Sequence, residues 1–205
     1  LTKNTLPENI EITGISTFSG CTALQEIELP ATITKINDYM FKDCTSLQKV
    51  TAKGTITEIG NSAFNSDASL VEIPDLSHVT TIGWRAFEDC TSLKSVDLHN
   101  VTSLGVYAFY KCKALSGLLG EIDLSGLETI PDMAFAYDEN ITSIRFNNKL
   151  RSIGKWAFIK ARTTTIKLPD TVESIGSYAF YYAALKGTLQ LPDSLNTLGN
   201  GAFSG

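Results

Sequence analysis

The chain has 205 residues, of which 43% are apolar and 19% are charged, so its composition is that of a globular protein and not of a disordered chain. Its formal net charge of −5 argues against nucleic acid as the main partner. No apolar run approaches the ~18 residues of a transmembrane helix, and the opening Leu1-Thr2-Lys3 is not a signal peptide, so we expect no membrane insertion and a mature form or fragment.

An internal repeat dominates the sequence. Nine of the ten phenylalanines recur at intervals of 22 to 26 residues, and we call them the anchor phenylalanines. Each anchor has Ile or Leu five residues before it in nearly every copy, usually Ala directly before it, and often Leu six residues after it. The anchors are Phe18, Phe41, Phe64, Phe87, Phe109, Phe135, Phe158, Phe180 and Phe203.

Within one repeat, the expected elements follow a fixed order. An Ile-Gly pair such as Ile59-Gly60 comes first, where glycine permits a sharp turn. The next stretch, 61–65 in this copy, is too short for more than one or two helical turns, which place Ala and Phe in the core. The alternation of residues 26–29 then predicts a strand with one buried face, and Pro30 ends that strand.

One repeat has too few apolar residues to bury a core, but stacked repeats bury one another's apolar columns. We therefore expect a repeat solenoid of about nine coils of 22–23 residues, with short parallel strands and short helical turns. The solenoid forms a single domain over residues 1–205. The insertion 116–120 lengthens one coil and predicts a bulge at one edge.

The repeated pattern I-G-x-x-A-F-x-x-C-x-x-L-x-x-V-x-L-P resembles the BspA-like class of leucine-rich repeats, from Leu6-Pro7 to Phe203. This resemblance implies a right-handed superhelix in a cell-surface or secreted protein, typically of a host-associated bacterium. It also implies non-enzymatic adhesion or protein binding, with no catalytic residues. The alternative is a structural spacer that presents other domains. Both ends fall inside a repeat, so we expect a longer parent protein.

All four cysteines lie three residues after an anchor, and they predict a ladder of buried free thiols. Disulfides remain the alternative, because coils ~4.8 Å apart bring equivalent residues close together. Neither the cysteines nor His78 and His99 have the spacing of a zinc site or a catalytic triad, so we expect no metal, no cofactor and no enzyme activity. The two disulfide candidates are Cys21–Cys44 and Cys90–Cys112.

The outward positions of the strand segments form the first candidate binding surface, on the concave side. They are mostly acidic in the first five coils and polar to basic in the last three, although the register over 72–76 is ambiguous by one residue. The acidic set is either a solvated face or a patch for a basic or mixed-charge protein on a host or bacterial surface. Its members are Glu26, Glu28, Glu72, Asp75, Asp97, Glu121 and Asp123.

Aromatic residues beside the anchors form the second candidate surface. Three of them share the position two before the anchor, and Met133 fills that position in the coil between. We expect a continuous ridge that either seals the joints between coils or contacts a protein, a glycan or a second copy of the chain. The oligomeric state is left open. The candidates are Tyr107, Tyr110, Trp156, Tyr178, Tyr181 and Tyr182.

Overall fold

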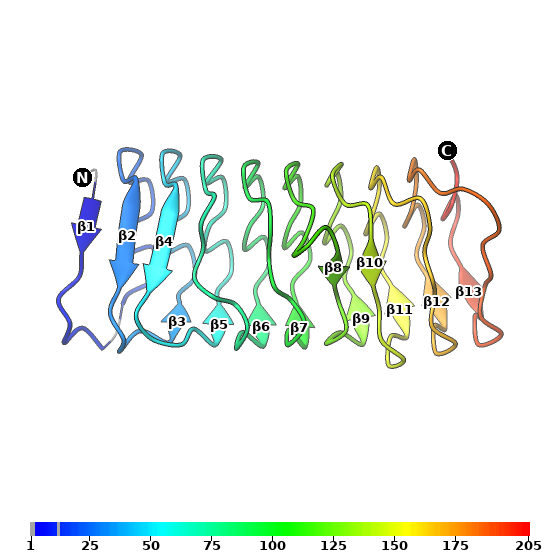
Figure 1. Ribbon diagram of the computed structural model, residues 1–205, viewed down its shortest axis with the longest axis horizontal. Helices are drawn as coiled ribbons and strands as arrows, with labels where there is room; N and C mark the ends of the chain where they lie inside the picture. The colour runs from blue at the N-terminus through cyan, green and yellow to red at the C-terminus, as the bar shows by residue number, and fades with distance from the viewer. Residues whose placement is uncertain (1–2, 12) are drawn as a thin grey trace.

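Successive coils lie side by side along the molecule, from the N-terminal end to the C-terminal end (Figure 1). This computed structural model describes residues 3–11 and 13–205. The coils build three columns of backbone, which we call the long-strand column, the short-strand column and the turn column. The predicted repeat solenoid with short parallel strands is confirmed.

The long-strand column contains the alternating segments, and it is interrupted. Its first parallel sheet is extended by an isolated bridge between Lys49 and Glu72. Its second sheet begins two coils further on, so the strands do not form one ladder. The first sheet has β1 (Lys3–Thr5), β2 (Glu26–Leu29) and β4 (Lys49–Ala52), and the second has β8 (Ile122–Asp123) and β10 (Ile144–Arg145).

The short-strand column contains two-residue strands at the Ile-Gly position, in two four-stranded parallel sheets. Glycine follows six of these eight strands and lets neighbouring coils approach closely: a Cβ on Gly105 would lie 2.3 Å from the backbone nitrogen of Trp84. The first sheet has β3 (Lys35–Ile36), β5 (Glu58–Ile59), β6 (Thr81–Ile82) and β7 (Ser103–Leu104). The second has β9 (Thr129–Ile130), β11 (Ser152–Ile153), β12 (Ser174–Ile175) and β13 (Thr197–Leu198).

The turn column contains the anchors, and here the expectation of short helical turns is wrong. No helix occurs in the described residues, because the residues two before and two after every anchor have positive φ. As a result, every second backbone N–H group in the turn points toward the next coil: Phe64 N–H donates to the Ala86 carbonyl at 2.8 Å. The N–H groups between them close local turns, as Asn65 does to Ser62 at 3.2 Å. Three bonds of the first kind join each pair of neighbouring turns.

The anchor phenylalanines form the centre of the core, as predicted. Neighbouring rings are stacked with centroids 5.1–5.5 Å apart and interplanar angles of 1–13°. Seven of the nine rings, from Phe41 to Phe180, are at most 1% exposed. Phe146, outside the series, packs edge-on against Phe158 at 6.2 Å. No helix in the part of the chain that is described is long and apolar enough to span a membrane.

The cysteines lie beside the anchors as free thiols, which is the first of the two alternatives left open by the sequence. Three are fully buried, and each donates its S–H to the carbonyl of the preceding coil's anchor at 3.0 Å, as Cys90 does to Phe64. Cys21 is only partly buried. Asp67 and Asp138 occupy the same position in coils without cysteine and are fully buried. Burial raises the pKa of Asp67 to about 9 and that of Asp138 well above its usual value.

Candidate functional site

The N-terminal carboxylates of the candidate acidic face lie beside lysines. The register of β2 and β4 pairs Glu26 with Lys49, whose ammonium lies 2.5 Å from Glu72. Glu28 lies 3.6 Å from the ammonium of Lys53. Lys53 also pairs with Glu8, so the two lysines offset only part of the negative charge here. The pattern of outward acidic residues did not indicate these pairings.

Further along the chain, the structure resolves the ambiguous register at residues 72–76. Pro74 is buried and Asp75 is exposed, so Asp75 is the outward residue. The Asp75 carboxylate accepts hydrogen bonds from the Ser77 backbone N–H at 2.9 Å and from its hydroxyl at 2.8 Å. These hydrogen bonds, with smaller contributions from the charges of His78 and His99, lower the pKa of Asp75.

The same turn recurs in the next two coils. The Asp97 carboxylate accepts the His99 N–H at 3.3 Å, and the Asp123 carboxylate accepts the Ser125 N–H at 3.0 Å. Each turn fixes its carboxylate where the strand segment ends. The sequence contains the signal for this row, the repeated tripeptides 75–77, 97–99 and 123–125 of the form Asp-Leu-Ser or Asp-Leu-His, but a search for outward positions alone does not find it.

His99 joins this row, although the sequence analysis gave it no role. Its Nδ1 lies 2.5 Å from the Asp97 carboxylate. That hydrogen bond raises the pKa of His99, and the negative charges of Asp97, Asp123 and Asp75 raise it further. The imidazole lies among carboxylates from three successive coils, and their negative charges favour its protonated form.

Arg145 is the main cation of this region. It comes from β10, where it pairs in register with Asp123 of β8. Its guanidinium lies 2.6 Å from Glu121 and 3.3 Å from Asp123, and the Ser143 hydroxyl donates to Glu121 at 3.0 Å. Because the Arg145 side chain is 60% exposed, it can also reach a partner.

The insertion 116–120 forms a projecting turn beside these charges, so the predicted bulge is present. Gly117 has a φ of 82°, and a Cβ there would lie 2.1 Å from the Glu121 carbonyl oxygen. Leu119, at the tip, has a φ of 54° and is 99% exposed. Among the described residues, it is the sole non-glycine residue outside the turn column with a positive φ. Leu118 beside it is 51% exposed.

A cleft of about 540 Å³ lies between the projecting turn and the charged row. A smaller cleft of about 290 Å³ on the other side of Leu118 is lined by Asp75, Asp97 and the half-exposed Val71. We call this region the central acidic site. Besides Glu72, which pairs with Lys49, it has four carboxylates against one arginine and one histidine: Asp75, Asp97, Glu121, Asp123, Arg145 and His99, with Leu118 and Leu119 at its edge.

The charges of the central acidic site suit the recognition of cationic groups. A cleft of this size, with an apolar edge and several carboxylates, can accept a basic side chain together with an apolar neighbour. No cluster of side chains in residues 3–11 and 13–205 has the arrangement of a metal site.

The aromatic candidates form two groups of ring contacts where a continuous ridge was expected. In the first, Tyr107 and Tyr110 lie edge to face at 5.4 Å, and the Arg85 guanidinium lies 4.7 Å from the Tyr107 ring. In the second, Trp156 stacks on Tyr178 at 6.0 Å.

The second group continues from Tyr178 to Tyr181 at 5.3 Å and on to Tyr182 at 4.3 Å. Met133 supplies no ring between the two groups. Most of these rings are half-buried, and Tyr182 is 58% exposed.

Comparison with known proteins points to one family. The family profile described as "BspA type Leucine rich repeat region" matches residues 1–116 and 119–205 in six copies. A leucine rich cell surface protein from Faecalibacterium prausnitzii A2-165 has a similar structure, with a TM-score of 0.61 and 22% identity over 91% of this chain. This chain spans only 46% of that one. The leucine rich repeat protein of T. pallidum is also similar, with a TM-score of 0.66 and 25% identity over 78% of this chain and 76% of that one. No curated protein sequence matches this chain.

Proposed function

We propose, for a chain that belongs to the BspA-type leucine-rich repeat family, a non-enzymatic role as a protein-binding or adhesion module of a bacterial cell-surface or secreted protein. The repeat fold is typical of protein-binding surface proteins, and the family is generally non-catalytic. Stacked coils suit such a role because they present an extended surface on which side chains from several coils converge.

The central acidic site is the proposed contact surface. The observation that carries this choice is Leu119, a fully exposed apolar side chain in the left-handed region, beside a cleft with an excess of carboxylates. A bulky residue in this conformation is costly to the fold, and such strain is concentrated at functional sites. The partner is a protein that presents lysine or arginine beside an apolar pocket able to accept Leu119.

We expect the N-terminal acids Glu26, Glu28 and Glu72 to contribute less to partner binding, because lysines already lie among them. The aromatic group from Trp156 to Tyr182 is a second contact surface, for protein or glycan. It is supported by the exposure of Tyr182 and its contact with Tyr181.

The test begins with a partner captured on the immobilised chain from host or bacterial surface proteins, which is then purified. That partner is titrated against wild type, Glu121→Gln/Asp123→Asn and Leu119→Ser at low and high salt. We expect both variants to weaken binding at least tenfold, the charge variant mainly at low salt, where screening is least.

The matched control is Glu26→Gln/Glu28→Gln, which removes two carboxylates from the N-terminal part of the same face, where Lys49 and Lys53 lie among the acids. An equal loss of binding in this control would show that the contact is not specific to the central acidic site. If the folded chain captured no partner, the spacer alternative would replace the binding role.

A further inference from the structure

Two extended segments near the C-terminal end of the long-strand column are unpaired. Residues 165–168 and 188–191 occupy the repeat positions of β2 and β4, yet neither segment forms a strand. Among the described residues, no backbone hydrogen bond joins 165–168 to β10 on one side or to 188–191 on the other. The Thr165 carbonyl accepts the Thr163 hydroxyl at 3.0 Å. The other main-chain donors and acceptors of the two segments, which pair elsewhere in this column, have no described backbone partner here.

The opening is local, because the same two coils are joined on both sides of it. Lys186 N–H donates to the Thr164 carbonyl at 2.9 Å before the opening. After it, the Ser194 hydroxyl donates to the Val172 carbonyl at 2.7 Å. The two segments thus separate between fixed ends.

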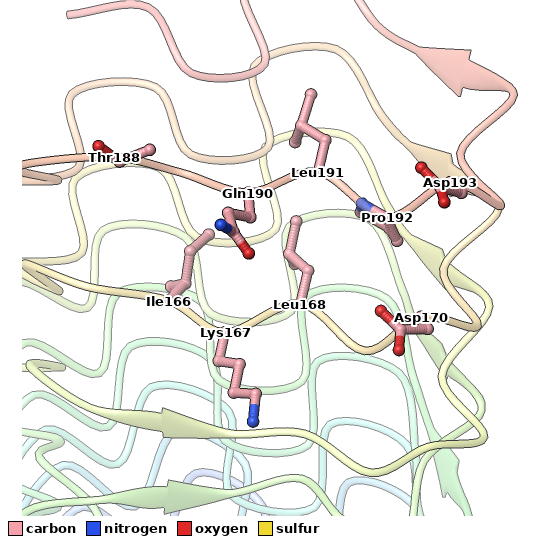
Figure 2. Close-up of a pocket in the computed structure, with 9 residues that line it drawn as sticks. All are labelled: Ile166, Lys167, Leu168, Asp170, Thr188, Gln190, Leu191, Pro192 and Asp193. Carbon is pink, nitrogen blue, oxygen red and sulfur yellow. The ribbon is translucent and has the colours of Figure 1, made fainter.

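A groove of about 560 Å³ occupies the opening (Figure 2). Figure 2 shows Ile166 from one segment and Gln190 from the other directed toward the space between them. Leu191, also lining the groove, is 44% exposed. The groove therefore combines apolar walls with two lines of unpaired main-chain groups.

We propose that this groove binds an extended peptide segment of a partner protein, which lies between the two segments and pairs its main chain with residues 165–168 on one side and 188–191 on the other. Pairing of this kind adds a strand to an open sheet edge, where main-chain hydrogen bonds supply affinity and alternate side chains fill the pockets. The occupant has apolar residues at alternate positions, because those side chains meet Ile166 and Leu191.

Two carboxylates indicate that one end of the bound peptide has a basic residue. In Figure 2, Asp170 and Asp193 lie at the same end of the groove, on opposite sides of it. Both side chains are exposed, and neither forms an ion pair with a described residue. A lysine or arginine at the corresponding end of the peptide meets both carboxylates. This groove shares no residue with the central acidic site, so the inference stands independently of the proposed function.

The probe is a capped peptide, acetyl-Lys-Val-Thr-Val-Thr-Val-amide, with a fully N-methylated twin that keeps the side chains and cannot donate main-chain hydrogen bonds. Amide hydrogen exchange of the full chain is followed by NMR. We expect the amides of 166–168 and 188–191 to exchange freely without peptide, and about tenfold more slowly at a peptide concentration ten times Kd. The N-methylated twin has no effect.

Two variants of the chain test the two parts of the inference. Gln190→Pro removes one main-chain donor, and Gln190→Ala keeps it; only the proline variant loses binding. Asp170→Asn/Asp193→Asn weakens binding several-fold at low salt, while Glu128→Gln, an exposed carboxylate elsewhere, does not. The asparagine variants remove no core contact, so they test the charge argument even if the proline variant unfolds.

Four results would overturn the inference. The first is protection of 166–168 and 188–191 in the free chain equal to that of Val50 in β4, because the segments would then be paired already. The second is no effect of peptide at millimolar concentration, and the third is equal binding of the N-methylated twin. The fourth is concentration-dependent protection without peptide, which would make a second copy of the chain the occupant.

Discussion

The turn column and the long-strand column are made by the same coils, but only the turn column is continuous. Its three bonds between neighbouring turns recur from Phe18 to Phe203 without a gap. The long-strand column breaks after Glu72 and again after β10. The central acidic site lies at the first break and the peptide groove at the second. In this solenoid, regular backbone builds the scaffold, and both surfaces that we propose for partners lie at its interruptions.

The difference between the two columns follows from which part of the repeat varies in length. The interval from the Ile or Leu position to the anchor is always five residues, as from Ile59 to Phe64. The interval from the anchor to the next Ile or Leu is usually 17 or 18 residues and reaches 21 between Phe109 and Ile130. All of this variation falls in the half of the coil that contains the long strand, so insertions change the side that we propose for binding and leave the anchors stacked.

The largest effect is expected from breaking the continuous column at its centre. Phe109→Ala removes a fully buried ring between two stacked neighbours, at 5.1 and 5.4 Å, and should lower the free energy of unfolding by about 3–5 kcal/mol. Urea denaturation measures this change. Phe203→Ala is the control, since its ring is only partly buried and has one stacked neighbour; its loss should be clearly smaller. Equal losses would contradict a column that couples neighbour to neighbour.

The second test concerns the pH dependence of the same column. Asp67 has a pKa of about 9 in the folded chain, raised by burial from 3.8, so the folded state keeps its proton while the unfolded state loses it. The unfolded state therefore gains relative stability as pH rises from about 4 to about 9, by at most about 1.4 kcal/mol per pH unit from this group.

Asp67→Asn removes this titration and should raise stability more at pH 8 than at pH 4. Its amide still has an oxygen to accept the Cys44 N–H, which Asp67 accepts at 2.8 Å. Urea denaturation at the two pH values measures the difference, with Asp89→Asn as a control at a less buried position of the same column. An equal gain at both pH values would show that Asp67 does not hold its proton in the folded state.

A third, smaller effect separates the two interpretations of the aromatic groups. Trp156 and Tyr178 are stacked with an interplanar angle of 7° and are half-buried, so a double-mutant cycle of Trp156→Ser and Tyr178→Ser should give a coupling of about 0.5–1.5 kcal/mol. A coupling near zero, with both variants as stable as wild type, would favour rings that are free to contact a partner.

The sequence predicts the turn column far better than the long-strand column, for physical reasons. An anchor such as Phe109 can be recognised from the sequence, because a buried column tolerates little besides one large apolar side chain per coil. The left-handed residues beside the anchors are not predictable from residue type, since tyrosine and tryptophan do not favour positive φ; inter-coil hydrogen bonds impose it on Tyr107 and Trp156. Residue type alone therefore indicates helical turns at these positions, and the structure has none in the described residues.

The candidate site could be predicted only in part. Outward carboxylates such as Asp97 and Asp123 follow from strand alternation, but the position of Lys49 beside Glu26 and Glu72 depends on the register between coils. His99 depends on a two-residue turn that folds its ring back onto Asp97. The opening between 165–168 and 188–191 has no local signal, because those residues alternate as well as those of paired strands.

A small change in stability of opposite sign, a gain, is expected at the insertion 116–120. Leu119→Asn puts a residue that tolerates the left-handed region at a position that buries nothing, so stability should rise by about 1 kcal/mol. The same substitution removes the apolar contact proposed for the partner, so binding of the captured partner should fall. Leu118→Asn is the control: its backbone is not left-handed, so no gain in stability is expected. A loss of stability in Leu119→Asn would mean that Leu119 packs against its own chain, and the insertion would then be part of the scaffold and not of the binding surface.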